Sequence, residues 1–286
     1  MSSIIQITEC PRDAMQGINT FIPTSKKIEY INALLRGGFS TLDFGSFVSP
    51  KAIPQMADTH IVIENINKSK NTELLAIVAN LKGAEQAVQY DAIDVLGYPF
   101  SVSETFQRRN TNATIEESLN RVDEIQNAAV KNDKKMVVYL SMGFGNPYGD
   151  EWSPETVAKW SEILYEKFDI KYQALSDTIG SANPKITSDL FDVLIPSNKS
   201  VEFSAHMHVK KENATSILKA AYQAGCRKFE GALKGYGGCP MAKDDLTGNM
   251  PTEIMLDWFQ NEGVETGIDI NNLNAALVLS NEIFNI

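Results

Sequence analysis

Two histidines separated by one residue, His206 and His208, give the sequence its sharpest chemical signal. The chain has 3 histidines in 286 residues, so a pair at this spacing is informative. In a β-strand, residues i and i+2 point to the same side, so both imidazoles could meet one ion. The pattern predicts a metal site. The alternative is a pair of histidines satisfied by neighbours on a half-buried strand.

A carboxylate and an amide from distant segments would complete such a site. Asp13 comes directly after the first strand-like segment, and Asn249 lies in the long loop after the last one. With the histidines they offer nitrogen and oxygen ligands and leave coordination positions open. This set suits a divalent metal ion, with Mg²⁺ or Mn²⁺ ahead of Zn²⁺ or Co²⁺.

Arg12 lies next to Asp13 and could act on a substrate. A fixed cation is most valuable where a carbonyl oxygen gains negative charge, as when an enolate forms. Asp177, in the segment SDTIG, is the expected carboxylate partner of Arg12. A turn or helix-capping role for Asp177 is equally compatible with its sequence context.

The three cysteines are scattered along the chain and form neither a disulfide framework nor a zinc knuckle pattern. Cys239 follows a glycine-rich stretch, which would suit a mobile acid or lid residue as well as a buried structural thiol. Cys10 and Cys226 are expected to pack in the core. We expect a reduced, cytoplasmic setting.

Eight β-rich runs alternate with helical patterns along most of the chain. This order favours a closed α/β barrel, the TIM (β/α)8 fold, as a single domain over residues 1–286 with an extra C-terminal helix at 271–286. No glycine-rich phosphate turn follows the first run, which disfavours a dinucleotide-binding fold. The runs are residues 4–9, 41–47, 74–80, 93–98, 136–142, 172–177, 201–209 and 227–233.

The reactive residues all follow or end these runs. In such a barrel, the carboxyl ends of the strands and the loops after them form the active-site face. Thr114 and Ser153 have the sequence form of helix N-caps that begin two of the intervening helices.

Composition excludes several classes of partner. The formal net charge is −10, whereas non-specific nucleic-acid binding needs a basic surface. No segment approaches the roughly 18 consecutive apolar residues that a membrane helix requires. No targeting peptide is recognisable at the amino terminus.

Five ordered segments resemble the hydroxymethylglutaryl-CoA lyase family. They are ECPRDAMQ, SFVSPKAIPQMADT, SDTIG, AHMH and GGCPMAKDDLTGN, and the resemblance extends over about residues 4–280. It implies metal-dependent cleavage of hydroxymethylglutaryl-CoA, an acyl-CoA, to acetyl-CoA and acetoacetate in leucine degradation. A homodimer is expected at the family level. Related Claisen synthases and retro-aldolases share only the Arg-Asp and His-x-His elements.

The resemblance also implies residue roles. Asp13, His206, His208 and Asn249 match the metal ligands, Arg12 the residue that steadies the enolate, and Cys239 the lid cysteine. Asp43 stands where the family has a catalytic glutamate. The general base would be Asp13 or His206. Arg108, Arg109 and Lys51 could meet the CoA phosphates, although a solvated surface charge is the more conservative interpretation of each.

Three departures from the family pattern bear on this expectation. Asp43 is one methylene shorter than the glutamate, Ala14 replaces a glycine, and an Asp-Thr-x-Gly segment after the second histidine is here Val209-Lys-Lys-Glu. The last change removes a segment that would be expected to support His208. These losses motivate one alternative of another class, a catalytically inactive barrel kept as a binding subunit.

Overall fold

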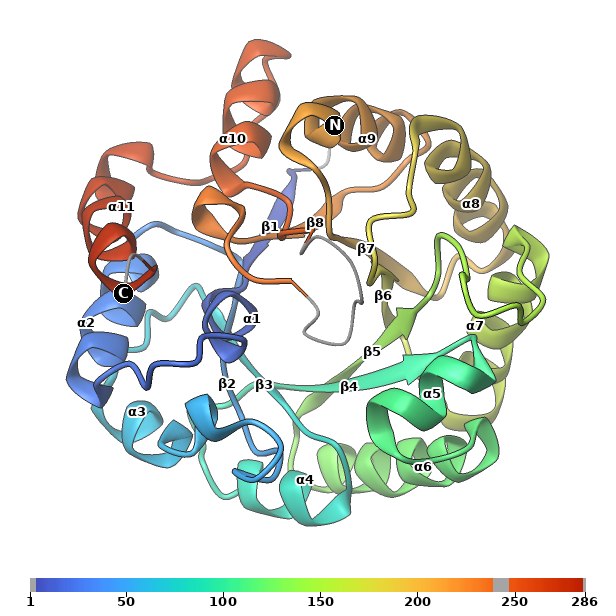
Figure 1. Cartoon of the computed structure of the whole chain (residues 1–286), viewed down its shortest axis with the longest axis horizontal. Coiled ribbons are helices and arrows are strands. Elements are labelled where there is room, and N and C mark those ends of the chain that lie inside the picture. Colours follow the sequence, from blue (N-terminus) through green and yellow to red (C-terminus); the bar gives the residue numbers. More distant parts are fainter. Residues whose placement is uncertain (1–3, 239–246, 285–286) are drawn as a thin grey trace.

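The computed structural model describes residues 4–238 and 247–284, and within them eight parallel strands close into a barrel (Figure 1). Each strand pairs with the next in the sequence, and β1 also pairs with β8. The predicted TIM barrel is confirmed. The strands are β1 (Gln6–Glu9), β2 (Thr41–Ser46), β3 (Glu73–Ile77), β4 (Val95–Ser101), β5 (Lys135–Ser141), β6 (Tyr172–Asp177), β7 (Glu202–Met207) and β8 (Lys228–Gly231).

Helices surround the barrel, and the short helix α1 (Pro11–Gln16) lies at one of its mouths (Figure 1). The C-terminal helix α11 (Ile270–Phe284) is present as expected and packs on α2 (Thr24–Leu35). The other helices are α3 (Thr59–Asn65), α4 (Leu81–Ala87), α5 (Glu104–Thr111), α6 (Ile115–Lys131), α7 (Pro154–Phe168), α8 (Pro184–Ser197), α9 (Lys211–Gln223) and α10 (Thr252–Asn261).

Two helix starts follow the local chemistry of the sequence. Thr114 and Glu117 form a reciprocal capping box at the start of α6, which satisfies two backbone N–H groups that the helix itself leaves unpaired. The Ser153 hydroxyl accepts from the backbone N–H of Thr156 at the start of α7. Both predicted N-caps are confirmed, and they fix where the helices begin on the outside of the barrel.

The barrel interior holds an apolar cluster and a set of buried polar side chains. Leu75, Val95, Val137 and Ala174 belong to one buried cluster on β3 to β6. Buried polar side chains occupy neighbouring positions of the ladder on the other strands: Asp43 on β2, Ser204 and His206 on β7, and Glu230 on β8. Further buried polar side chains, including Ser141 on β5 and Asp177 on β6, lie toward the carboxyl ends of the strands.

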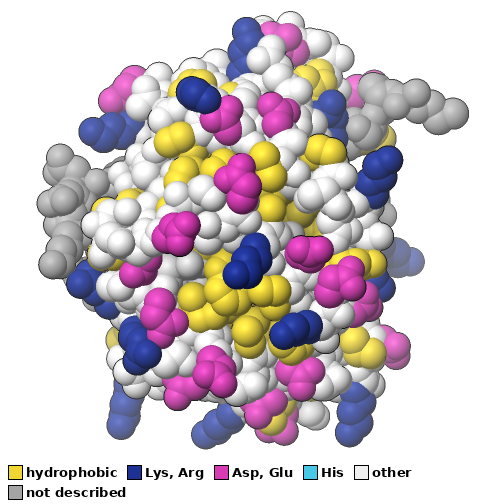
Figure 2. Space-filling view, turned by 90° about the vertical axis from the view of Figure 1, so that its right-hand side faces the viewer, with side chains coloured by type: hydrophobic (Ala, Val, Ile, Leu, Met, Phe, Trp, Pro, Cys, Tyr) yellow, Lys and Arg dark blue, Asp and Glu magenta, His cyan; other side chains and the backbone are white. Residues whose placement is uncertain are grey.

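The exterior carries mixed charge. Figure 2 shows the face on the right-hand side of Figure 1, where acidic and basic side chains are interspersed around an apolar patch. Neither sign forms a continuous field on this face. Among the described residues, no helix is both long enough and apolar enough to cross a membrane.

A buried carboxyl group, Glu9, connects β1 to the segment after β8. One Glu9 oxygen accepts from the Leu233 backbone N–H at 2.7 Å, and the other lies 2.5 Å from the Thr252 hydroxyl. Burial raises the pKa of Glu9 to about 8, although both hydrogen bonds oppose the shift. Glu9 therefore keeps its proton in the folded state up to about pH 8, whereas in the unfolded chain it loses this proton near pH 4.5.

We expect Glu9→Gln to remove a pH dependence of stability. Between about pH 4.5 and pH 8 the folded wild type binds one proton more at Glu9, so its free energy of unfolding falls as the pH rises through this window. Glutamine carries no titrating proton and keeps an acceptor and a donor. Thermal unfolding followed by circular dichroism should show the variant gaining stability relative to the wild type between about pH 5 and about pH 8.5. If the difference in stability between Glu9→Gln and the wild type stays constant over this pH range, this account is contradicted.

Candidate active site

Asp13 and the two histidines converge at the carboxyl-end mouth of the barrel. Their ligand atoms all lie within 4.8 Å of one another, and all three residues are buried. His206 belongs to β7, but β7 ends at Met207, so His208 lies one residue beyond the strand and not within it as predicted. An isolated bridge to Asn249 holds His208 in extended conformation, which preserves the common orientation of the pair.

The donor set fits a divalent cation. His208 Nε2 is buried without a hydrogen-bond partner and lies 3.5 Å from Asp13 Oδ2. An unpartnered buried polar atom is costly unless a ligand uses it. Two imidazole nitrogens and a carboxylate oxygen are common ligands of such ions. These three residues could therefore hold a metal ion together.

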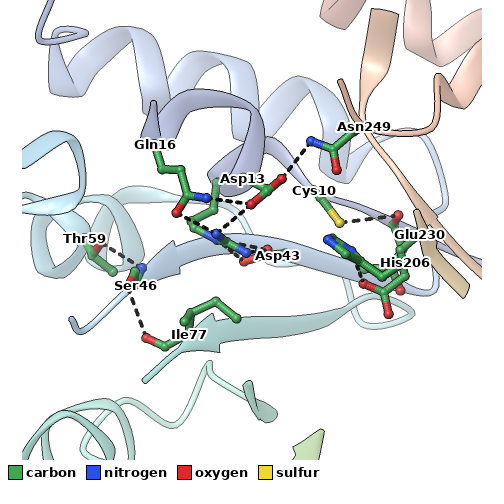
Figure 3. Close-up of polar contacts among 12 residues, drawn as sticks. Cys10, Asp13, Gln16, Asp43, Ser46, Thr59, Ile77, His206, Glu230 and Asn249 are labelled. Carbon is green, nitrogen blue, oxygen red and sulfur yellow. Dashed lines mark hydrogen bonds and ion pairs between the residues drawn. The ribbon is translucent and has the colours of Figure 1, made fainter. Parts of the chain in front are cut away.

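Asn249 lies beside Asp13 (Figure 3). Its amide nitrogen donates to Asp13 Oδ2 at 2.8 Å and to the Tyr236 carbonyl at 2.8 Å. Figure 3 shows the amide oxygen directed away from the Asp13 carboxylate. The structure thus brings Asp13, His206 and His208 together as possible ligands, and Asn249 contacts Asp13 through its amide nitrogen.

Arg12 pairs with Asp43 on β2. Its Nε lies 3.1 and 3.0 Å from the two Asp43 oxygens, and its Nη2 lies 2.5 Å from Oδ2. The guanidinium also donates to Asp13 at 3.0 Å and to Gln16 at 2.8 Å. The predicted pairing of Arg12 with Asp177 is wrong, because Asp43 reaches the guanidinium directly from the floor of the site.

Asp177 instead organises the turn after β6. Its Oδ1 accepts from the backbone N–H of Ser181 at 2.9 Å, and its Oδ2 accepts from that of Ala182 at 2.7 Å. This is the turn-stabilising role that the sequence also allowed. The same turn carries Thr178, whose carbonyl oxygen lies 3.1 Å from His208 Nδ1. Thr178 thus supports His208 although the family's Asp-Thr-x-Gly segment is absent.

The buried charges perturb one another strongly. Burial alone would raise the pKa of Asp13, but the Arg12 guanidinium and the two histidines outweigh it and hold the pKa well below its ordinary value. Burial raises the pKa of Asp43 to about 6 despite its pairing with Arg12. Burial would lower the pKa of His206, yet the Glu230 carboxylate raises it above the ordinary value. Asp13 therefore remains an anion that can meet a cation.

A cavity of about 410 Å³ opens beside this cluster. Arg12, Asp13, His206 and His208 line it, and Arg109 lines it from α5. Of the three cations considered for phosphate contacts, only Arg109 lines this cavity. Lys51 is exposed, and Arg108 pairs with Glu104 at 2.8 Å. Cys239 lies outside the described residues.

Three residues that support the site were not predicted from the sequence. Gln16 donates to Asp13 Oδ1 at 2.7 Å, Thr178 supports His208, and Glu230 contacts His206 at 3.0 Å. Gln16 lies one helical turn from Asp13, and a search for side chains at that spacing could have found it. Glu230 follows from the pairing of β7 with β8, which directs it to the same side of the sheet as His206.

Gly237 closes the site from the loop after β8. Its φ is +94°, and a Cβ there would lie 2.7 Å from Asn249 Nδ2 and 2.8 Å from the Asp13 carbonyl oxygen. The Cα of Ala14 would also lie 2.8 Å away. Residue 237 therefore has no room for a side chain where the loop passes the backbone of Asp13 and Ala14.

We expect Gly237→Ala to disturb the site, with Gly149→Ala as the matched control. Both glycines have positive φ, but a Cβ at Gly149 meets nothing within 4 Å. Strain alone costs about 1–3 kcal/mol, so both variants should lose some stability. Only Gly237→Ala should also weaken Mn²⁺ binding in calorimetric titration. Equal effects of both substitutions would contradict the close approach at residue 237.

The fold and this cluster define an α/β barrel with a metal-capable site at the carboxyl ends of its strands. The HMGL-like family model matches residues 4–279. A hydroxymethylglutaryl-CoA lyase of Bacillus subtilis is 34% identical over 266 residues, which are 93% of this chain and 88% of that protein. The mitochondrial hydroxymethylglutaryl-CoA lyase of Rattus norvegicus is 33% identical, over 92% of this chain and 80% of that protein.

Solved structures agree. The HMG-CoA lyase of Brucella melitensis superimposes with a TM-score of 0.92 at 29% identity and covers 100% of both chains. The HMG-CoA lyase of Acinetobacter baumannii, solved with coenzyme A and 3-methylmalate, gives a TM-score of 0.92 at 31% identity, over 100% of this chain and 93% of that one. The chain belongs to the HMGL-like family.

Proposed function

We propose that this protein is a hydroxymethylglutaryl-CoA lyase that cleaves its substrate to acetyl-CoA and acetoacetate. The observation that carries the proposal is the convergence of Asp13, His206 and His208 on one point beside Arg12. The similarity to hydroxymethylglutaryl-CoA lyases over more than nine-tenths of the chain supports the substrate. The reaction belongs to leucine degradation.

The proposed cofactor is a divalent metal ion, Mg²⁺ or Mn²⁺, held by Asp13, His206, His208 and Asn249. Oxygen ligands and open positions suit these hard ions. When bound, the ion would act as a Lewis acid toward the substrate's oxygens. The lowered pKa of Asp13 supports this role because the carboxylate remains deprotonated over the working pH range.

The proposed mechanism assigns separate tasks to Arg12 and to the base. Asp13 takes the proton of the tertiary hydroxyl, since Glu230 holds Nδ1 of His206 and its Nε2 is a proposed metal ligand, and the carbon–carbon bond then breaks toward the thioester enolate. Arg12 stabilises that enolate, because Asp43 and Gln16 hold its guanidinium in a fixed position at the cavity. Cys239 or a water molecule returns a proton to the enolate carbon.

The two site histidines, His206 and His208, should be essential for activity. With Mg²⁺ present, the purified protein should release acetoacetate from hydroxymethylglutaryl-CoA. His206→Ala and His208→Ala should each lower kcat by at least about 100-fold, because each removes a proposed ligand. His60→Ala is the matched control, since His60 is exposed, and it should retain full activity. Full activity in His206→Ala would refute the assignment.

Three further measurements on the purified protein distinguish the alternative functions. Product formation from acetyl-CoA and an oxo-acid acceptor would indicate a Claisen synthase. Cleavage of a free hydroxy-oxo-acid without CoA would indicate a retro-aldolase. Failure to bind a stoichiometric metal ion would indicate an inactive barrel.

Arg109 should contribute to recognition of the CoA moiety. Arg109 lines the cavity and stacks on Tyr148 at 4.5 Å, whereas the adjacent Arg108 is exposed and paired with Glu104. Arg109→Gln should raise the KM for the acyl-CoA several-fold, on the order of 1 kcal/mol of binding, with little change in kcat. Arg108→Gln should leave both constants unchanged. Equal changes in the two variants would contradict this placement.

We also propose a cytoplasmic location and a homodimer. The two described cysteines, Cys10 and Cys226, are buried free thiols, which suits a reducing compartment. The dimer is a family-level proposal, and sedimentation of the purified protein would test it.

A further inference from the structure

Glu230 is a buried carboxyl group that the proposed reaction does not use. It is 4% exposed and lies on β8, directly beside His206 on β7 in the ladder. Its Oε2 lies 3.0 Å from His206 Nδ1, and its Oε1 accepts from the Ser204 hydroxyl at 2.6 Å. Figure 3 shows the carboxyl group beneath the imidazole, on the side opposite Asp13. Both oxygens are therefore committed to β7.

The contact determines which imidazole nitrogen is available to an ion. With Nδ1 held by the carboxylate, Nε2 of His206 is left on the side of Asp13 and His208. His208 has the same arrangement, since its Nδ1 meets the Thr178 carbonyl and its Nε2 is unpartnered. The two histidines thus present corresponding nitrogens to one point, and a different oxygen acceptor orients each.

The two acceptors differ in charge and in accessibility. Thr178 offers a neutral carbonyl, whereas Glu230 offers a carboxylate, which makes the attached imidazole a stronger electron donor to a metal ion. Glu230 also lines a polar cavity of about 580 Å³ at the opposite mouth of the barrel, while His206 lines the active-site cavity. The Glu230–His206 pair therefore separates the two cavities inside the barrel.

We propose that Glu230 is a positioning residue for the metal centre, which fixes His206 with Nδ1 protonated and Nε2 directed at the ion, and that Ser204 holds the carboxylate in place. This inference rests on the proposed metal-dependent function. It adds a carboxylate–histidine–metal unit in which the carboxylate never touches the substrate.

The test is metal affinity, measured without substrate. Mn²⁺ and Mg²⁺ are titrated calorimetrically into the metal-free full chain of the wild type, Glu230→Ala, Glu230→Gln and Ser204→Ala. Loss of such a supporting carboxylate typically weakens metal binding by about 10- to 100-fold, which is the expectation for Glu230→Ala. Glu230→Gln keeps an oxygen acceptor and should lose less, and Ser204→Ala should lose least.

Glu9→Gln is the matched control, because Glu9 is equally buried on the adjacent strand and contacts neither histidine. Its metal affinity should equal that of the wild type. If the wild type binds no ion, the proposed metal centre fails. If the wild type binds and Glu230→Gln, Glu230→Ala and Ser204→Ala bind equally well, this inference alone is overturned. Should Glu230→Ala fail to fold, the other two variants decide.

A spectroscopic readout separates positioning from a general structural role. The chain has 3 histidines, so long-range proton–nitrogen correlation spectra of the metal-free protein, at a pH where the rings are neutral, should resolve each ring. His206 should carry its proton on Nδ1 in the wild type and lose this single tautomer in Glu230→Ala. The exposed His60 provides the internal reference. An unchanged His206 pattern in Glu230→Ala would contradict the proposal, whereas Glu230→Gln, which keeps an oxygen acceptor, should retain the wild-type tautomer.

Discussion

The site depends on how buried negative charge is balanced inside the barrel. Asp13, Asp43 and Glu230 are all buried, and Arg12 is the buried guanidinium that contacts Asp13 and Asp43. A buried charge is tolerated only when it is paired or bound to a metal ion. Arg12 compensates Asp43 and part of Asp13. The remaining negative charge, next to two imidazoles, is what a divalent cation would neutralise.

This constraint also explains the arrangement of the neighbouring residues. Gln16 and Asn249 bring uncharged donors to Asp13, which fix the carboxylate without neutralising it. Gly237 lets the loop after β8 approach close enough for the Tyr236 carbonyl to hold Asn249. The departures from the family pattern are therefore absorbed locally. The Thr178 carbonyl supports His208 where the family's acidic segment is missing.

The sequence predicted what depends on periodicity and topology. The alternation of elements was enough for the barrel, and the spacing of His206 and His208 was enough for the site, because the carboxyl ends of parallel strands meet at one face. Contacts between side chains of distant segments were harder to predict from the sequence. Asp43 meets Arg12 because β2 is paired with β1, which leads into α1, whereas Asp177 ends β6, which is paired with β5 and β7. Glu230 was missed because its role arises from the lateral pairing of β7 with β8, which no local pattern encodes.

The central claim is that one divalent ion is held jointly by Asp13, His206 and His208. Anomalous diffraction from Mn²⁺-soaked crystals tests it most directly. A single strong peak among Asp13 Oδ2 and the Nε2 atoms of both histidines is the predicted result. A well-ordered structure with no peak there, or with the ion bound elsewhere, would contradict the account.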